Sequence, residues 1–120
     1  MRHTSRAIII KNKQLLLLTG HGADFYWTPG GGREEDETAE EALVREVKEE
    51  LSMDVLEYSP YLFYEYGNQI VSSYIVDIEH DFAISNEITG YIWFKPGDDY
   101  KLSEGLEFKL LPQLLADGLL

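Results

Sequence analysis

Residues 29–54, PGGGREEDETAEEALVREVKEELSMD, join three consecutive glycines to a segment crowded with carboxylates. Residues 38–51 are rich in Ala, Leu, Glu, Lys and Arg, which are good helix formers, and they predict one helix. Acidic residues gather at its start, where the helix dipole favours them. An apolar residue recurs every four positions, at Ala39, Leu43, Val47 and Leu51, so the pattern predicts a stripe that packs against a core.

Three carboxylates share one face of this predicted helix. Glu46, Glu49 and Glu50 stand at positions i, i+3 and i+4, within an arc of roughly 100°. Each like-charged pair at such spacing destabilises a helix by roughly 0.2–0.5 kcal/mol. Mg²⁺ would relieve this repulsion, since it prefers carboxylate oxygens and takes waters and phosphates as its other ligands. Taken alone, however, a Glu-rich helix is usually a solvated face and a glycine run is usually a turn.

The complete spacing of the segment resembles the signature of the Nudix hydrolases of the MutT type, G-x5-E-x7-R-E-U-x-E-E-x-G-U, where U is a bulky aliphatic residue. The lead-in WTPGG at residues 27–31 is also similar to that family. Matching positions are Gly31, Glu37, Arg45, Glu46, Val47, Glu49, Glu50 and Met53. One position departs, because Ser52 stands where the family has glycine. That glycine ends the helix in a left-handed conformation, which would cost a serine about 1 kcal/mol.

The resemblance implies an α/β (α+β) fold, an α/β/α sandwich with a mixed β-sheet in which the signature forms a loop–helix–loop, over a single domain of residues 1–120. It implies a pyrophosphohydrolase that uses Mg²⁺ or Mn²⁺ to cleave a nucleoside diphosphate linked to another group, releasing a nucleoside monophosphate. A nucleoside triphosphate is the expected substrate. ADP-ribose or a dinucleoside polyphosphate is the alternative substrate, and a nucleotide-binding Nudix domain without turnover is the alternative function.

By matching position, the resemblance assigns Glu46, Glu49, Glu50 and the Gly30 carbonyl to the metal. Arg45 would orient a neighbouring glutamate through a charge-assisted hydrogen bond.

The other assigned residues lie around this set. Gly31 and Gly32 would support the loop, and Glu37 would support the loop or contact the metal through water. Glu87, six residues before Trp93, matches a late glutamate that joins the metal site or acts as the base in some members. Glu46, Glu49 and Glu87 all stay open as the general base.

Aromatic residues near the glycines offer platforms for a nucleobase, since stacking contributes about 1–3 kcal/mol per base. We expect Trp27 to be the stacking residue. Phe25, Tyr26, Tyr64, Tyr66 and Tyr74 are weaker candidates, because aromatic residues on strands usually lie in the core.

The remaining elements follow from local patterns. A hairpin is expected between residues 6–10 and 14–19 around Asn12, and a second between residues 62–66 and 69–78 around Gly67-Asn68. A polar loop over residues 80–90 precedes a strand at residues 91–94, and a helical tail follows that Pro112 breaks or kinks. This order predicts a mixed sheet with helices on its faces.

Composition limits the functions available. The 120 residues carry a formal net charge of −12, from 10 Lys plus Arg against 22 Asp plus Glu, which argues against binding a nucleic-acid polymer. A small phosphorylated substrate requires a metal ion that reverses the local field. No segment has the ~18 apolar residues of a membrane span or the pattern of a signal peptide, and there is no cysteine, so we expect a cytoplasmic protein.

Two further expectations concern histidines and partners. His3, His21 and His80 are expected in loops or at the terminus, in no zinc pattern. The resemblance also allows a homodimer.

Overall fold

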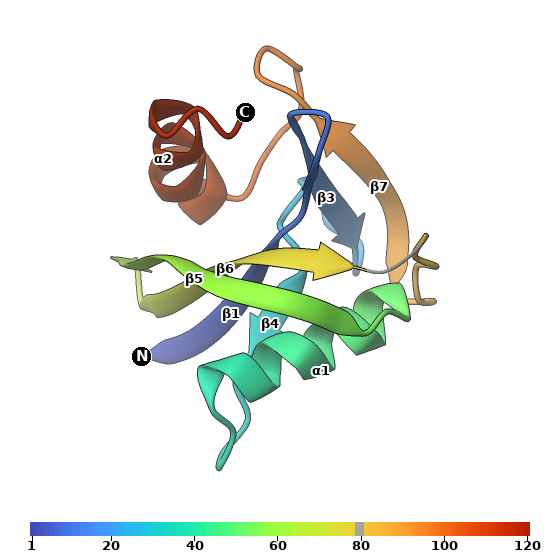
Figure 1. Ribbon diagram of the computed structural model, residues 1–120, viewed down its shortest axis with the longest axis vertical. Helices are drawn as coiled ribbons and strands as arrows, with labels where there is room; N and C mark the ends of the chain where they lie inside the picture. The colour runs from blue at the N-terminus through green and yellow to red at the C-terminus, as the bar shows by residue number, and fades with distance from the viewer. Residues whose placement is uncertain (79–80) are drawn as a thin grey trace.

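The structure is a computed structural model that describes residues 1–78 and 81–120. Its strands form two sheets, a four-stranded sheet in the order β4-β1-β6-β5 and a three-stranded sheet in the order β2-β3-β7 (Figure 1). The elements are β1 Arg2–Ile8, β2 Ile10–Lys11, β3 Gln14–Gly20, β4 Gly30–Gly32, α1 Ala39–Leu51, β5 Val55–Tyr66, β6 Gln69–Ile78, β7 Ile88–Phe94, the π-helical turn η1 Leu106–Leu110 and α2 Leu111–Ala116. The larger sheet is mixed because β1 runs parallel to β6, which confirms the predicted mixed sheet.

The first predicted hairpin is only partly correct. Asn12 and Lys13 have φ of 51° and 60°, as a tight two-residue turn between β2 and β3 requires. Residues 6–8, however, belong to β1 and pair with β4 and β6. The chain passes from one sheet to the other at Ile9, which local alternation does not reveal. The second hairpin is confirmed, with β5 starting earlier than predicted, at Val55.

The predicted helix is confirmed as α1, and local side chains explain both of its ends. Thr38 is the N-cap: its hydroxyl accepts from the Glu41 N–H at 3.0 Å, and its own N–H donates to the Glu41 carboxylate at 3.0 Å. The helix ends at Leu51, and Ser52 takes the left-handed conformation with φ 57°. Ser52 therefore adopts the glycine-like geometry of the signature at the cost of a side chain in a disfavoured region.

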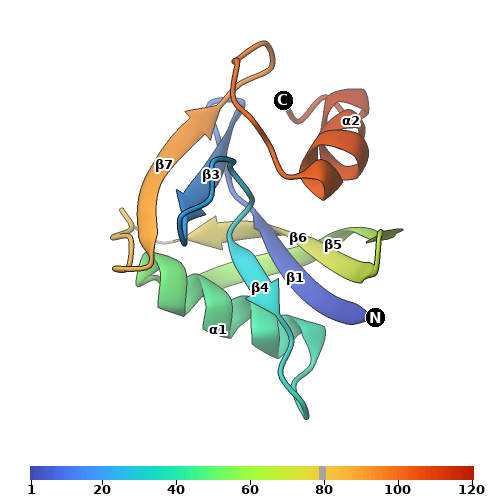
Figure 2. The same cartoon turned by 180° about the vertical axis from the view of Figure 1, so that it is seen from behind.

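Two cores lie on opposite faces of the larger sheet, with α1 on one face and the C-terminal helical segment on the other (Figures 1 and 2). The apolar stripe of α1 is buried in the first core, although Ala39 is only partly buried. Leu16 and Leu18 of β3 join this core, whereas Leu15 and Leu17 join the second. Alternate side chains of β3 thus pack into the two different cores. The predicted α/β/α sandwich is confirmed.

Several boundaries differ from the prediction. The strand β7 begins at Ile88, and the tail is not broken at Pro112, because the π-helical turn just before it accommodates a residue that lacks an N–H. His3 lies near the terminus and within β1, and His80 lies outside the described residues. No helix within the described ranges is long and apolar enough to cross a membrane.

Candidate active site

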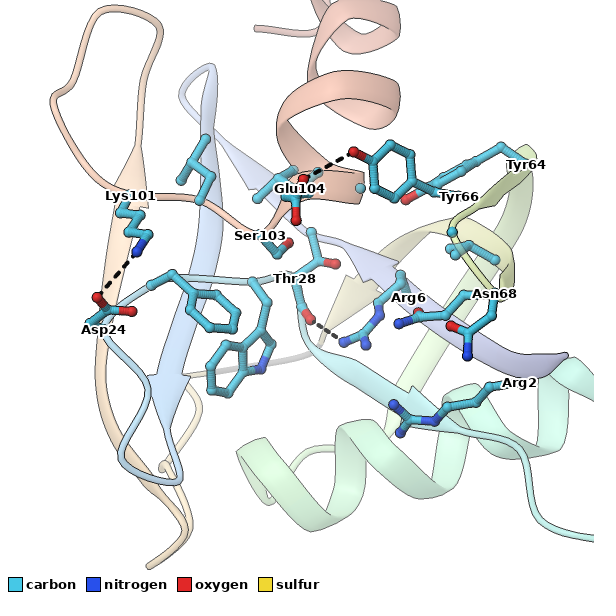
Figure 3. Close-up of a pocket in the computed structure, with 18 residues that line it drawn as sticks. Arg2, Arg6, Asp24, Thr28, Tyr64, Tyr66, Asn68, Lys101, Ser103 and Glu104 are labelled. Carbon is cyan, nitrogen blue, oxygen red and sulfur yellow. Dashed lines mark hydrogen bonds and ion pairs between the residues drawn. The ribbon is translucent and has the colours of Figure 1, made fainter.

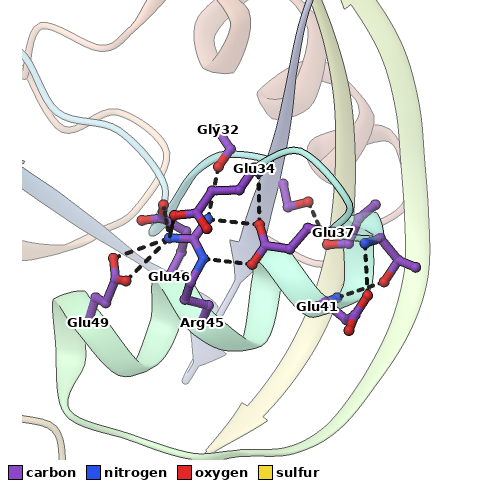
Figure 4. A network of polar contacts seen from close by, with 10 residues as sticks. Gly32, Glu34, Glu37, Glu41, Arg45, Glu46 and Glu49 are labelled. Carbon is purple, nitrogen blue, oxygen red and sulfur yellow. Dashed lines mark hydrogen bonds and ion pairs between the residues drawn. The ribbon is translucent and has the colours of Figure 1, made fainter.

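Arg45 makes most of the contacts in the polar network on α1 (Figure 4). Its Nε donates to Glu37 Oε2 at 2.7 Å and its Nη2 donates to Glu37 Oε1 at 3.0 Å, and Nη2 also donates to the Gly32 carbonyl at 3.0 Å. The fork geometry of guanidinium suits this bidentate contact. Hydrogen bonds from Arg45 lower the pKa of Glu37 to about 2. Arg45 therefore holds the loop after β4 against α1, mainly through its bidentate contact with Glu37 and also through a longer ion pair of 3.7 Å to Glu34.

The third nitrogen of the same guanidinium reaches two predicted metal ligands. Arg45 Nη1 donates to Glu46 Oε1 at 3.0 Å and to Glu49 at 3.3 Å. These contacts are separate from those that hold Glu37, because Glu37 is bound through Nε and Nη2. Glu46 and Glu49 can exchange their contact with Nη1 for another cation while the loop stays fastened.

The glycines of β4 allow the carboxylates to lie directly against the main chain. A Cβ atom on Gly31 would stand 2.7 Å from the Glu46 carboxylate, so any side chain there would displace it. The Gly30 N–H donates to Glu50 Oε1 at 2.7 Å. Gly30 has φ of 140°, and a Cβ atom there would lie 2.0 Å from the Ser5 carbonyl oxygen. Both positions therefore require glycine.

Glu50 is a buried carboxylate without a direct cationic partner among the described ion pairs. Its residue is 8% exposed, and burial raises its pKa to about 7. The nearby charges of Glu46 and Glu49 raise that pKa further, while the Gly30 N–H and Arg6 oppose the shift. The three carboxylates thus share one electrostatic environment in which a negative charge on Glu50 is disfavoured.

The donor set fits Mg²⁺ or Mn²⁺ in its chemistry. Among the described residues no three acidic or histidine side chains are gathered into a ready-made metal cage. Mg²⁺ and Mn²⁺ prefer carboxylate oxygens and complete their shells with water and substrate phosphates. Glu46 and Glu50 both lie against the glycine strand β4, and Glu49 lies about one helical turn after Glu46. The Gly30 peptide lies beside these carboxylates through its N–H.

A pocket of about 610 Å³ opens on the face of the larger sheet opposite to α1 (Figure 3). The loop before β4 and the segment before η1 form its walls, joined by an ion pair of 3.2 Å between Lys101 and Asp24. Trp27 lines this pocket, and its role in stacking on a base stays a prediction. Its volume lies in the range of small-molecule sites.

The other aromatic candidates divide between pocket and core. Phe25, Tyr64 and Tyr66 also line the pocket, whereas Tyr74 does not. The prediction for Tyr74 as a stacking residue is wrong, because it is 1% exposed and its hydroxyl donates to Glu40 on α1. Tyr26 packs edge-on against Tyr100 outside the pocket.

Glu87 lies in a turn with its side chain exposed. Its carbonyl accepts from the His21 N–H at 3.3 Å, and the Ser85 N–H donates to the Glu50 carbonyl at 3.0 Å. The turn is therefore held against the backbone at the C-terminal end of α1. The role of Glu87 stays a prediction.

The model of the NUDIX domain family matches residues 1–112. The chain belongs to the Nudix family. No curated protein matches the sequence at a significant level.

Solved Nudix structures resemble the chain over nearly its whole length. A MutT NUDIX hydrolase from Burkholderia pseudomallei has a TM-score of 0.80 at 19% identity, covering 92% of this chain and 95% of its own. The E. coli ORF135 protein has a TM-score of 0.71 at 26% identity, covering 97% and 89%. An ADP-ribose pyrophosphatase from Streptococcus suis has a TM-score of 0.74 at 18% identity, covering 98% and 90%. These likenesses establish the Nudix fold.

The basic residues of the Nudix pocket were missed by the sequence reasoning. Arg2 and Arg6 of β1 and Lys101 line it, although the chain has only 10 Lys plus Arg. A signal was present, because Arg2, Thr4 and Arg6 alternate with residues that face α1. The sequence alone does not show which face of the sheet these residues lie on, because that depends on the parallel pairing of β1 with β6.

Proposed function

We propose that this Nudix protein is a Mg²⁺-dependent pyrophosphohydrolase that cleaves a nucleoside triphosphate or a related nucleotide to a nucleoside monophosphate. The observation that carries the proposal is the contact of Glu46 and Glu50 with the glycine strand β4, because Gly32 of the same strand lies against Arg2, which lines the pocket. A substrate with its nucleoside in the pocket needs to pass only one strand to bring its phosphates to these carboxylates.

Glu46, Glu49 and Glu50 are the residues proposed to hold the metal. When bound, Mg²⁺ supplies charge neutralisation for the diphosphate and lowers the pKa of bound water. The chain itself supplies the orientation. Glu37 binds Arg45 through Nε and Nη2, so only Nη1 of Arg45 contacts Glu46 and Glu49. We propose that a metal ion replaces this Nη1 contact.

A carboxylate is proposed to take the proton of the attacking water. Glu46, Glu49 and Glu87 are the available groups, because Glu50 is committed to Gly30 and buried. Glu49 has a side chain 57% exposed and Glu46 one 15% exposed, so Glu49 reaches solvent water more readily.

The substrate class is argued from the pocket. One pocket of about 610 Å³ beside the glycine strand suits one nucleoside better than the two of a dinucleoside polyphosphate. Both a MutT hydrolase and an ADP-ribose pyrophosphatase share the fold, with TM-scores of 0.80 and 0.74, so ADP-ribose belongs in the test.

The test is a nucleotide panel. Ribo- and deoxyribonucleoside triphosphates, ADP-ribose and diadenosine tetraphosphate are incubated with the protein and Mg²⁺, and the products are separated by ion-exchange chromatography. We expect a nucleoside monophosphate and pyrophosphate from at least one triphosphate, and a loss of about 10–100-fold or more in Glu50→Gln.

Glu107→Gln is the matched control, because it removes one exposed carboxylate from the C-terminal segment, on the face of the sheet opposite to α1. Full activity in Glu50→Gln would reject the metal assignment. Nucleotide binding without turnover under Mg²⁺ or Mn²⁺ would favour the binding-domain alternative.

A further inference from the structure

Two arginines of β1 line the pocket, and the buried hydroxyl of Thr4 lies between them on the same strand. Strand alternation places Arg2, Thr4 and Arg6 on one face of β1, and both arginines line the pocket (Figure 3). The neighbouring strand adds Gln69 and Val71 to the same surface. A protein with a net charge of −12 therefore concentrates two of its few cations on one small surface.

Arg6 is half-buried and has few partners. Its Nη1 donates to the Thr28 carbonyl at 3.0 Å, which is its one side-chain hydrogen bond among the described residues. A guanidinium has five N–H donors, and no carboxylate within the described ranges forms an ion pair with this one. Leaving such donors unpaired next to a cavity is costly unless a ligand or water accepts them.

Arg2 is exposed, and its side chain makes no hydrogen bond or ion pair with any described residue. Its location is nevertheless defined, because a Cβ atom on Gly32 would stand 3.1 Å from its Nη2 and 3.2 Å from its Nε. The guanidinium thus lies next to Gly32 of β4 and also lines the pocket.

Thr4 provides an independent sign of an incomplete site. It lies between the arginines on the same face, is 2% exposed, and its Oγ1 has no hydrogen-bond partner among the described residues. Buried polar atoms are normally satisfied, so an isolated one between two guanidinium groups is unusual.

The two faces of β4 carry opposite charges. Gly31 faces the Glu46 carboxylate and the next residue, Gly32, faces the Arg2 guanidinium. Successive residues of a strand point to opposite sides, so only the backbone of β4 separates an anionic side from a cationic one. A diphosphate that extends from one side of this strand to the other meets carboxylates on one side and arginines on the other. The carboxylates can bind phosphate only through a metal ion, whereas the arginines can bind it directly.

We propose that Arg2 and Arg6 form a metal-independent anion subsite for the phosphate attached to the nucleoside. This inference rests on the proposed function for the identity of the ligand. The arginines hold that phosphate directly through charge-assisted hydrogen bonds, while the carboxylates of α1 act on the far phosphate through the metal. Arg2 and Arg6 are therefore substrate-positioning residues.

The experiment measures binding without metal, so it does not depend on turnover. AMP, GMP, CMP and UMP and their four nucleosides are titrated into the protein in EDTA by isothermal calorimetry. We expect at least one monophosphate to bind about tenfold or more tightly than its nucleoside, since a hydrogen bond to a charged group contributes that much. We expect Arg2→Gln to remove this preference while the affinity for the nucleoside stays unchanged.

Lys101→Gln is the matched control, because it removes a cation that also lines the pocket but is paired with Asp24. Its phosphate preference should equal that of the wild type. Arg6→Lys keeps the positive charge of the half-buried residue. It should nevertheless lose most of the preference for the monophosphate over the nucleoside, since a lysine lacks the planar fork of a guanidinium. A urea unfolding curve of each variant checks that it is folded.

The outcomes separate the two proposals. Equal binding of monophosphate and nucleoside, the absence of binding by all eight compounds at 5 mM (about the weakest affinity of interest), or equal losses in Arg2→Gln and Lys101→Gln would each overturn the subsite. A protein that prefers monophosphates through Arg2 but hydrolyses nothing in the panel would keep the subsite and reject the proposed enzyme.

Discussion

Replacing Glu50 by glutamine should stabilise the metal-free protein at high pH. The folded pKa of Glu50 is about 7 against 4.5 for a free carboxyl, because the side chain is buried beside Glu46 and Glu49. Below pH 4.5 both states are protonated and Glu50 has no effect. Between pH 4.5 and 7 the unfolded chain loses its proton while the folded chain keeps it, so the free energy of unfolding falls as pH rises.

The full effect is present above pH 7 and corresponds to about 3 kcal/mol as an upper value. Glutamine does not titrate, and its carbonyl can still accept the Gly30 N–H. In EDTA, we therefore expect Glu50→Gln to match the wild type at pH 4 and to exceed it by roughly 1–3 kcal/mol at pH 8.5.

The assay is urea unfolding, followed by circular dichroism, at both pH values and with or without 10 mM Mg²⁺ (roughly a saturating concentration for a millimolar site). Mg²⁺ should stabilise the wild type at pH 8.5 and have little effect on the variant. Glu107→Gln, with its exposed carboxylate, should show no pH-dependent difference from the wild type. A Glu50→Gln variant that is no more stable than the wild type at pH 8.5 would refute the burial argument.

Four further outcomes follow from α1 and its flanking loops. Ser52→Gly should raise the free energy of unfolding by about 1 kcal/mol, because Ser52 is left-handed, and an unchanged urea midpoint would contradict this. Thr38→Ala should lower it by about 1 kcal/mol through loss of the capping box with Glu41, with Glu41→Gln as a milder companion in the same urea assay. Arg45→Lys should lower kcat by about 10–100-fold in a steady-state assay while the protein stays folded, because lysine cannot hold Glu37 bidentately; unchanged kcat would separate this pair from catalysis. The Glu37 pKa of about 2 means that this ion pair stabilises the fold above pH 4.5 and is lost only as pH falls through 2, which an acid titration of unfolding tests.

The helix and its carboxylates were predictable because their signals are local. Four-residue apolar spacing identifies the buried face of α1, and the signature fixes the distance from Gly31 to Glu50 along the chain. Thr38 and Glu41 carry a capping-box pattern that would have placed the helix start one residue later than predicted.

The division into two sheets was not predictable from the same reasoning. The pairing of residues 2–8 with residues 69–75 joins segments far apart in sequence, and alternation alone does not select a partner. Consequently the side of β1 that carries Arg2 and Arg6 stayed unassigned, and the pocket that four separate segments form around it was missed.

If the α1 carboxylates hold a divalent cation against the glycine strand, the affinity of the protein for Mn²⁺ depends on Glu50. The free Mn²⁺ signal in electron paramagnetic resonance is followed as protein is added at pH 7.5, for the wild type, Glu50→Gln and Glu107→Gln. We expect the wild type and Glu107→Gln to bind Mn²⁺ with the same affinity and Glu50→Gln to bind it about tenfold or more weakly. Equal Mn²⁺ affinity in all three proteins would contradict this expectation.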